Sequence, residues 1–178
     1  FGLLINSPII KKNIIDSLNI PLVNIHIGHL PYYRNKYSNI RAMLENQNPA
    51  ISIHLIDEYI DFGKILSIIK FPYLPYESFE ILNLKTNNFR ISAFITFKNY
   101  FLNHNTFSSL NVRRHKKQLR YLLPTKENLS LIDGKKNNKT YISDFKVIGM
   151  LENEIKKDYK KLIEPYLNFK TIINYHKI

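Results

Sequence analysis

Hydrophobic residues recur along the first hundred positions in two patterns, one typical of strands and one of helices. Short runs rich in Ile and Leu, bounded by Pro, Gly and Asn, predict strands at residues 1–6, 22–27, 51–56 and 64–73. Apolar residues at helical spacing predict helices at residues 8–18, from 38 onward and at 77–101. This succession predicts an α/β fold in which a mostly parallel sheet is flanked by helices.

Local signals refine two of these elements. Ser7 followed by Pro8 is typical of a helix start, with Ser as the cap and Pro in the first turn. The strands at 51–56 and 64–73 are separated by a short acidic loop. We therefore expect them to form a partly antiparallel edge of the sheet.

The pattern changes after residue 102, and we divide the chain there into 1–102 and 103–178. The second part opens with a basic stretch, which is more often a solvated charge run than a nucleic-acid site. A possible β-hairpin follows, with strands at 129–132 and 140–149, and then a charged helix at 152–166. We expect a small extension with a hairpin and a helix.

The strand at residues 22–27 carries the first candidate chemistry. Side chains alternate between the two faces of a strand, so Asn24 and His26 share one face while Val23, Ile25 and Ile27 share the other. Gly28 and the proline that follows end the strand and place this polar pair near its carboxyl end. Open α/β sheets bind their ligands at that edge.

An acidic loop supplies the second part. Asp57, Glu58 and Asp61 follow the strand at 51–56. An amide, an imidazole and a carboxylate together can stabilise an oxyanion, handle a proton and orient the group that handles it. Asn24, His26 and Asp61 are therefore candidates for acyl-transfer chemistry.

These residues carry a resemblance to the folate-dependent formyltransferases, and most closely to the nucleotide-sugar N-formyltransferases. Four motifs match in order and spacing: Asn24-Ile25-His26, Leu30-Pro31-Tyr32-Tyr33-Arg34, Ser52-Ile53-His54 and Asp61-Phe62-Gly63-Lys64-Ile65. The resemblance covers residues 1 to about 82 and implies a Rossmann-like sheet. It also implies that the chain lacks the first β/α units of that sheet, so that residues 1–102 form the C-terminal part of the catalytic domain.

The sequence departs from the family pattern at four positions. Asn35 replaces a Gly, Ile27 a Pro, Phe62 a Thr and Ala50 a Gly. None of these changes affects the three polar residues. Asn tolerates a left-handed backbone better than most residues, so Asn35 can still serve a turn that favours Gly.

The resemblance implies a reaction in which a primary amine takes a formyl group from 10-formyltetrahydrofolate. By resemblance Asn24 and His26 stabilise the oxyanion, while Asp61 orients His26 and manages the proton that leaves the amine. For His29 and His54 we favour a structural role, with His54 bonded to a carbonyl. The histidines form no convincing metal site, and we expect no metal.

The resemblance also implies two sets of binding residues. The folate donor is expected at Phe1, Gly2, Leu3, Leu4, Ile56, Asp57, Glu58 and Tyr59. The acceptor is expected at Tyr32, Tyr33 and Arg34, which would shape the mouth of the site.

The expected acceptor is the amine of a nucleotide-linked amino-dideoxy sugar, as used for surface glycans such as lipopolysaccharide O-antigen. Methionyl-tRNA and glycinamide ribonucleotide are the alternative amines. An inactive homologue that acts as a basic binding module remains a further alternative. We also consider a homodimer possible.

Composition narrows the remaining classes. The net charge is +12, but the chain is also crowded with Ile, Asn and Lys, which is typical of nucleotide bias in a gene. We therefore regard nucleic acid as an unlikely partner. The chain has no Cys and no apolar run long enough to span a membrane, so we expect a cytoplasmic enzyme.

Overall fold

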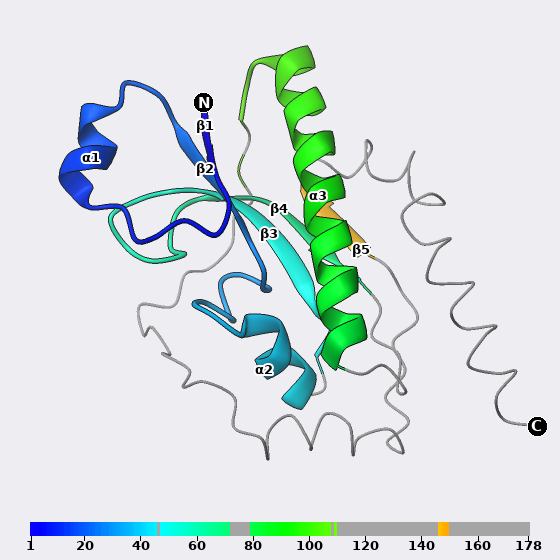
Figure 1. The fold of residues 1–178 in the computed structure, drawn as a ribbon. Helices are drawn as coiled ribbons and strands as arrows, with labels where there is room; N and C mark the ends of the chain where they lie inside the picture. The colour runs from blue at the N-terminus through cyan, green and yellow to red at the C-terminus, as the bar shows by residue number, and fades with distance from the viewer. Residues whose placement is uncertain (46, 72–78, 108, 110–145, 150–178) are drawn as a thin grey trace, which may run out of the picture.

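A sheet of five strands forms the centre of the computed structural model, which describes residues 1–45, 47–71, 79–107, 109 and 146–149 (Figure 1). The strands lie in the order β1-β2-β3-β4-β5. Their bounds are β1 Gly2–Leu4, β2 Leu22–His26, β3 Ala50–Leu55, β4 Ile65–Lys70 and β5 Lys146–Gly149. The helices that flank the sheet complete the predicted α/β class, which is confirmed.

The strand directions are mixed. β1 and β2 are parallel, whereas β2–β3, β3–β4 and β4–β5 are antiparallel. Within the described strands the sheet is therefore less parallel than expected. The segment holding α1 forms the one crossover between parallel neighbours in the described sheet, and the β3–β4 loop is too short for another. The segment holding α2 is long enough for a crossover but returns the chain antiparallel.

The first helix is shorter than its sequence pattern predicts. α1 spans Lys12–Ser17 and has no buried residue, so no tertiary packing extends it toward Pro8. Its N-cap is Lys11, without a side-chain cap, and the predicted cap at Ser7 does not form. Residues 6–10 instead line a cavity beside β1 and β2.

The second helix begins where the sequence predicts. α2 spans Ser38–Leu44 and follows two residues with a left-handed backbone, Asn35 at φ 71° and Tyr37 at φ 63°. The departure at Asn35 thus preserves the conformation that a Gly would adopt. This turn reverses the chain between the end of β2 and α2.

The third helix, predicted at residues 77–101 as one long or broken helix, is a single element that covers the sheet. α3 spans Phe79–His104 and packs against β2 and β3 (Figure 1). Phe89, Ala93 and Phe97 on α3 join Val23 and Ile53 in the main core. No helix in the described ranges is both long and apolar enough to cross a membrane.

Only part of the C-terminal prediction falls on described residues. β5 lies within the predicted strand at 140–149 and adds to the edge of the sheet beside β4. Its expected hairpin partner at 129–132, the helix at 152–166 and most of the basic stretch lie outside the described residues. The division into 1–102 and 103–178 stays a prediction.

Gly63 permits a close approach between the β3–β4 loop and the end of β3. A Cβ on residue 63 would lie 1.7 Å from the backbone oxygen of Leu55. We predict that Gly63→Ala lowers the free energy of unfolding by about 2 kcal/mol or more, because backbone atoms must move apart.

Urea denaturation measures this change. Gly2→Ala is the matched control, since its Cβ would meet only the flexible side-chain ends of Leu22 and Ile20. Equal losses in the two variants would contradict the proposed close approach at Gly63.

Candidate active site

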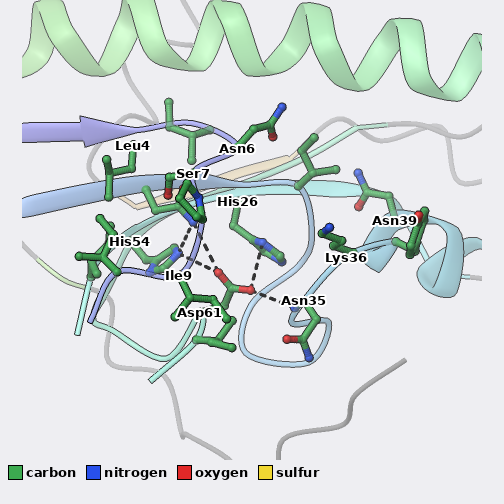
Figure 2. A pocket seen from close by; sticks show the side chains of 18 of the residues that line it. Leu4, Asn6, Ser7, Ile9, His26, Asn35, Lys36, Asn39, His54 and Asp61 are labelled. Carbon is green, nitrogen blue, oxygen red and sulfur yellow. Dashed lines mark hydrogen bonds and ion pairs between the residues drawn. The ribbon is translucent and has the colours of Figure 1, made fainter. Parts of the chain in front are cut away.

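The candidate residues on β2 point away from the main core. Val23 and Ile25 are almost fully buried in that core, while Asn24 and His26 lie on the opposite face. β3 pairs with β2 so that His54 stands directly opposite Asn24. This register brings the Asn24 amide beside His54, close to the ring of His26 at the carboxyl end of β2. Figure 2 shows the two rings on either side of Asp61.

Asp61 completes the cluster from the β3–β4 loop. Its backbone is left-handed, at φ 51°, which directs the carboxylate inward between the rings of His26 and His54 (Figure 2). Oδ2 accepts a hydrogen bond from the backbone N–H of Asn35 at 2.9 Å and lies 3.5 Å from His26 Nδ1. Oδ1 lies 3.5 Å from Asn24 Nδ2 and 3.6 Å from His54 Nε2.

The surroundings of His26 determine which ring nitrogen carries the proton. Nε2 lies 2.8 Å from the backbone oxygen of Tyr33, which can only accept, so Nε2–H is the donor. The lone pair of a neutral ring is then on Nδ1, facing Asp61. Gly28 allows this packing, because a Cβ there would lie 2.5 Å from His26 Nε2.

His54 is held in the opposite tautomer. Its Nδ1 donates to the backbone oxygen of Leu55 at 2.8 Å, and its Nε2 accepts from Asn24 Nδ2 at 3.1 Å. The expected carbonyl partner is thus present, but the ring also orients Asn24 and borders Asp61. The contact between His54 and Asn24 was not predicted, because the antiparallel register of β2 and β3 cannot be derived from the local sequence pattern.

Charges in the cluster follow from burial and from these contacts. Burial lowers the pKa of His26 below its ordinary value, because desolvation outweighs the attraction of Asp61. Burial acts to raise the pKa of Asp61, but its contacts with His54, His26 and Asn35 N–H outweigh that effect and hold it well below the usual range. At neutral pH an ionised carboxylate therefore lies beside an uncharged His26.

A cavity of about 1210 Å³ opens over this cluster. Asn24, His26 and Asp61 line it together with most of the residues predicted to hold folate, namely Leu4, Ile56, Asp57, Glu58 and Tyr59. Phe1, Gly2 and Leu3 are not among the residues that line it. Phe1 packs against aromatic rings of α3, and Leu3 packs on the main core.

The three residues predicted for the acceptor also lie off the cavity. Tyr32 is exposed and its ring contacts His29, while Tyr33 is buried and donates to Glu45 at 2.7 Å. Arg34 is buried with its guanidinium 4.4 Å above the ring of Phe62. This contact packs Phe62, the departure in the last motif, beneath the β2–α2 loop.

Three residues that were not predicted from the sequence also lie at this site. Ser38 Oγ lies 3.3 Å from His26 Nε2 and donates to the backbone oxygen of Asn35 at 2.6 Å. Lys36 and Asn39 line the cavity on the α2 side. Across the described ranges, no three His, Cys, Asp or Glu side chains are grouped so as to hold a metal ion.

Neither a protein-family model nor a curated protein sequence matches the chain. Solved structures match at the level of the fold. The formyltransferase PseJ from Anoxybacillus kamchatkensis, in complex with UDP-4,6-dideoxy-4-formamido-L-AltNAc and tetrahydrofolate, has a TM-score of 0.60 and 18% identity, over 72% of this chain and 67% of that protein.

Two further structures agree. A 4-N formyltransferase from Francisella tularensis has a TM-score of 0.57 and 16% identity, over 84% of this chain and 69% of its own. WlaRD, a sugar 3N-formyl transferase in the presence of dTDP and 5-N-formyl-THF, has a TM-score of 0.56 and 20% identity, over 78% of this chain. The match spans 52% of WlaRD, about half of that protein. At these identities the likeness establishes the fold, and at that level it confirms the resemblance to sugar N-formyltransferases.

His29, in the loop after β2, has a buried imidazole from which the pH dependence of stability can be predicted. Burial, assisted by the charge of Lys70, lowers the pKa of His29 to about 4 from an ordinary 6.5. The folded state therefore binds fewer protons than the unfolded state between these values. The contribution of the neutral His29 to the stability of the fold is therefore complete above pH 6.5 and is lost as the pH falls to about 4.

We predict that protonation of His29 lowers the free energy of unfolding by up to about 3 kcal/mol between pH 6.5 and about pH 4. Urea denaturation of the wild type and His29→Asn at pH 8 and pH 4.5 measures this change. The comparison at pH 8 isolates the loss of packing. The variant should lose less stability on acidification than the wild type, and identical losses would contradict the assignment.

Proposed function

We propose that this protein transfers a formyl group from 10-formyltetrahydrofolate to the primary amine of a nucleotide-linked amino-dideoxy sugar. The observation that carries the proposal is the convergence of Asn24, His26 and Asp61 at the carboxyl end of β2. The proposal is also supported by a fold shared with sugar N-formyltransferases.

Attack of the amine on the formyl carbon would form a carbon–nitrogen bond and place negative charge on the formyl oxygen. When that oxygen regains its double bond, the bond between the formyl carbon and N10 of the folate would break, and tetrahydrofolate would leave with the proton that the amine had lost. Asn24 Nδ2 is a donor for that oxygen. One of its hydrogens is directed to His54 Nε2 at 3.1 Å, while the other makes a long, 3.5 Å contact with Asp61. The weakly held hydrogen is the one that a substrate oxygen can take over.

His26 is the candidate acceptor for the proton that leaves the amine. Its Nε2–H is fixed on the oxygen of Tyr33, so Nδ1 is the basic atom. Once Nδ1 is protonated, the imidazolium can stabilise the oxyanion as a charged donor. The adjacent Asp61 carboxylate favours the protonated ring and keeps its orientation.

The lining of one end of the cavity supports placing the pterin of the donor there. Leu4, Pro8, Ile9 and Ile10 contribute apolar lining, and residues 56–60 line the same cavity. Flat, partly polar rings suit such a cleft. When bound there, 10-formyltetrahydrofolate supplies the formyl carbon.

The acceptor class is a finer proposal. The neighbour PseJ is described with a UDP-linked 4-formamido sugar, and WlaRD is described as a sugar 3N-formyl transferase with dTDP. We propose a nucleotide sugar of this chemistry for the present protein, with a place in surface-glycan synthesis in the cytoplasm. Methionyl-tRNA and glycinamide ribonucleotide are the alternatives that the test must separate.

The test incubates the full-length protein with 10-formyltetrahydrofolate and each acceptor in turn. The panel holds a UDP-linked 4-amino-4,6-dideoxy sugar, a dTDP-linked 3-amino-3,6-dideoxy sugar, glycinamide ribonucleotide and methionyl-tRNA. Mass spectrometry should detect the added formyl group on a sugar nucleotide. A folded protein that modifies none of them would contradict the proposal.

We predict that Asp61→Asn and His26→Gln lower kcat by roughly 10²- to 10⁴-fold, because proton transfer and charge stabilisation are lost. His54→Gln should give a smaller loss, since Asn24 loses an orienting partner. His104→Gln, at the exposed end of α3, is the control and should retain full activity. Equal activity in all four variants would remove the cluster from the mechanism.

A further inference from the structure

Two buried polar atoms in the cavity wall have no partner within the described part of the chain. They are Nδ2 of Asn39, on α2, and Oγ1 of Thr86, on α3. The side chains are only 4% and 3% exposed. A buried polar atom without a partner is destabilising, so each requires an explanation.

Both residues belong to the wall of the cavity that holds the Asn24–His26–Asp61 cluster. Figure 2 shows Asn39 and Lys36 on one side of His26 and Asp61, with Leu4 and Ile9 on the other. The apolar residues form the proposed donor end. Asn39 therefore stands at the end left for the acceptor, and Thr86 lines the same cavity from α3.

Neither side chain is fully accounted for by local bonding. Asn39 Oδ1 accepts a hydrogen bond from the backbone N–H of Ala50 at 2.9 Å, which orients the amide. Its Nδ2 has no hydrogen-bond partner among the described residues. A helical Thr commonly donates to the carbonyl one turn back, as Thr96 does to Ser92 at 2.9 Å. Thr86 makes no such bond among the described residues.

We propose that Asn39 and Thr86 form an acceptor subsite that binds an uncharged oxygen, a hydroxyl of the amino sugar; this inference rests on the proposed function. An amide Nδ2 can only donate, whereas a threonine hydroxyl can donate and accept. A sugar hydroxyl matches both, since it accepts from Asn39 and donates to Thr86.

The chemistry disfavours a phosphate at this position. Both partners are neutral and almost fully buried, so a charge there would lose its water without a countercharge. Lys36 is exposed on the same side of the cavity and is better suited to the nucleotide's diphosphate. The subsite is therefore expected to select the sugar and not the nucleotide.

Thr86→Val tests the subsite because it keeps the shape and removes only the hydroxyl. Thr86→Ser restores the hydroxyl, and Thr96→Val is the matched control on the same helix, where the hydroxyl is bonded internally. The acceptors are the UDP-linked and dTDP-linked amino sugars of the panel, used with the full-length protein. KM is measured separately for the acceptor and for 10-formyltetrahydrofolate.

Thr86→Val should raise the KM of the acceptor by about three- to tenfold and leave the KM of the donor unchanged. Thr86→Ser should stay close to wild type, and Thr96→Val should not change either KM. With an acceptor that lacks the bound hydroxyl, the effect of Thr86→Val should vanish.

Two results would overturn the subsite. If Thr86→Val and Thr96→Val have the same KM for the acceptor, the Thr86 hydroxyl does not bind the acceptor and the subsite is wrong. The proposed function would still stand in that case, provided that the wild type transfers the formyl group. A wild-type enzyme that formylates no sugar nucleotide would overturn the proposed function, and the subsite with it.

Discussion

The arrangement of the site depends on one carboxylate. Asp61 accepts a hydrogen bond from the backbone N–H of Asn35 and borders the side chains of Asn24 and His26 on β2 and of His54 on β3. A buried charge is tolerated only where donors surround it. The donors to Asp61 are the backbone N–H of Asn35 and, at longer range, the Asn24 amide, and they favour its ionised form. The charge of Asp61 in turn orients Asn24 and favours a protonated His26 during the reaction.

Unusual backbone conformations and close packing at two glycines allow the cluster to form. Asn35 and Asp61 both adopt a left-handed conformation, one to present its N–H and the other to receive it. Gly28 and Gly63 allow loops to pack against His26 and the end of β3 where a Cβ would collide. Such conformations persist only when their surroundings over-determine them, and they cluster at functional sites.

Much of this could be predicted from the sequence. The period-two pattern of β2 places Asn24 and His26 on one face, and the motif order brings Asp61 after β3. The role of His54 could not be predicted, because strand direction depends on long-range pairing that a local pattern does not encode. The proposed acceptor subsite could not be predicted for a similar reason, since Asn39 and Thr86 are ordinary helical positions until α2 and α3 are placed in space.

The central claim is that an ionised Asp61 faces a neutral His26 whose proton is fixed on Nε2. Two-dimensional NMR of ¹⁵N-labelled histidine, which distinguishes tautomers and the imidazolium, tests it directly. At pH 7 the account predicts an uncharged His26 with its proton on Nε2 and a His54 tautomer with its proton on Nδ1. A His26 that is imidazolium at pH 7, or neutral with its proton on Nδ1, would contradict it.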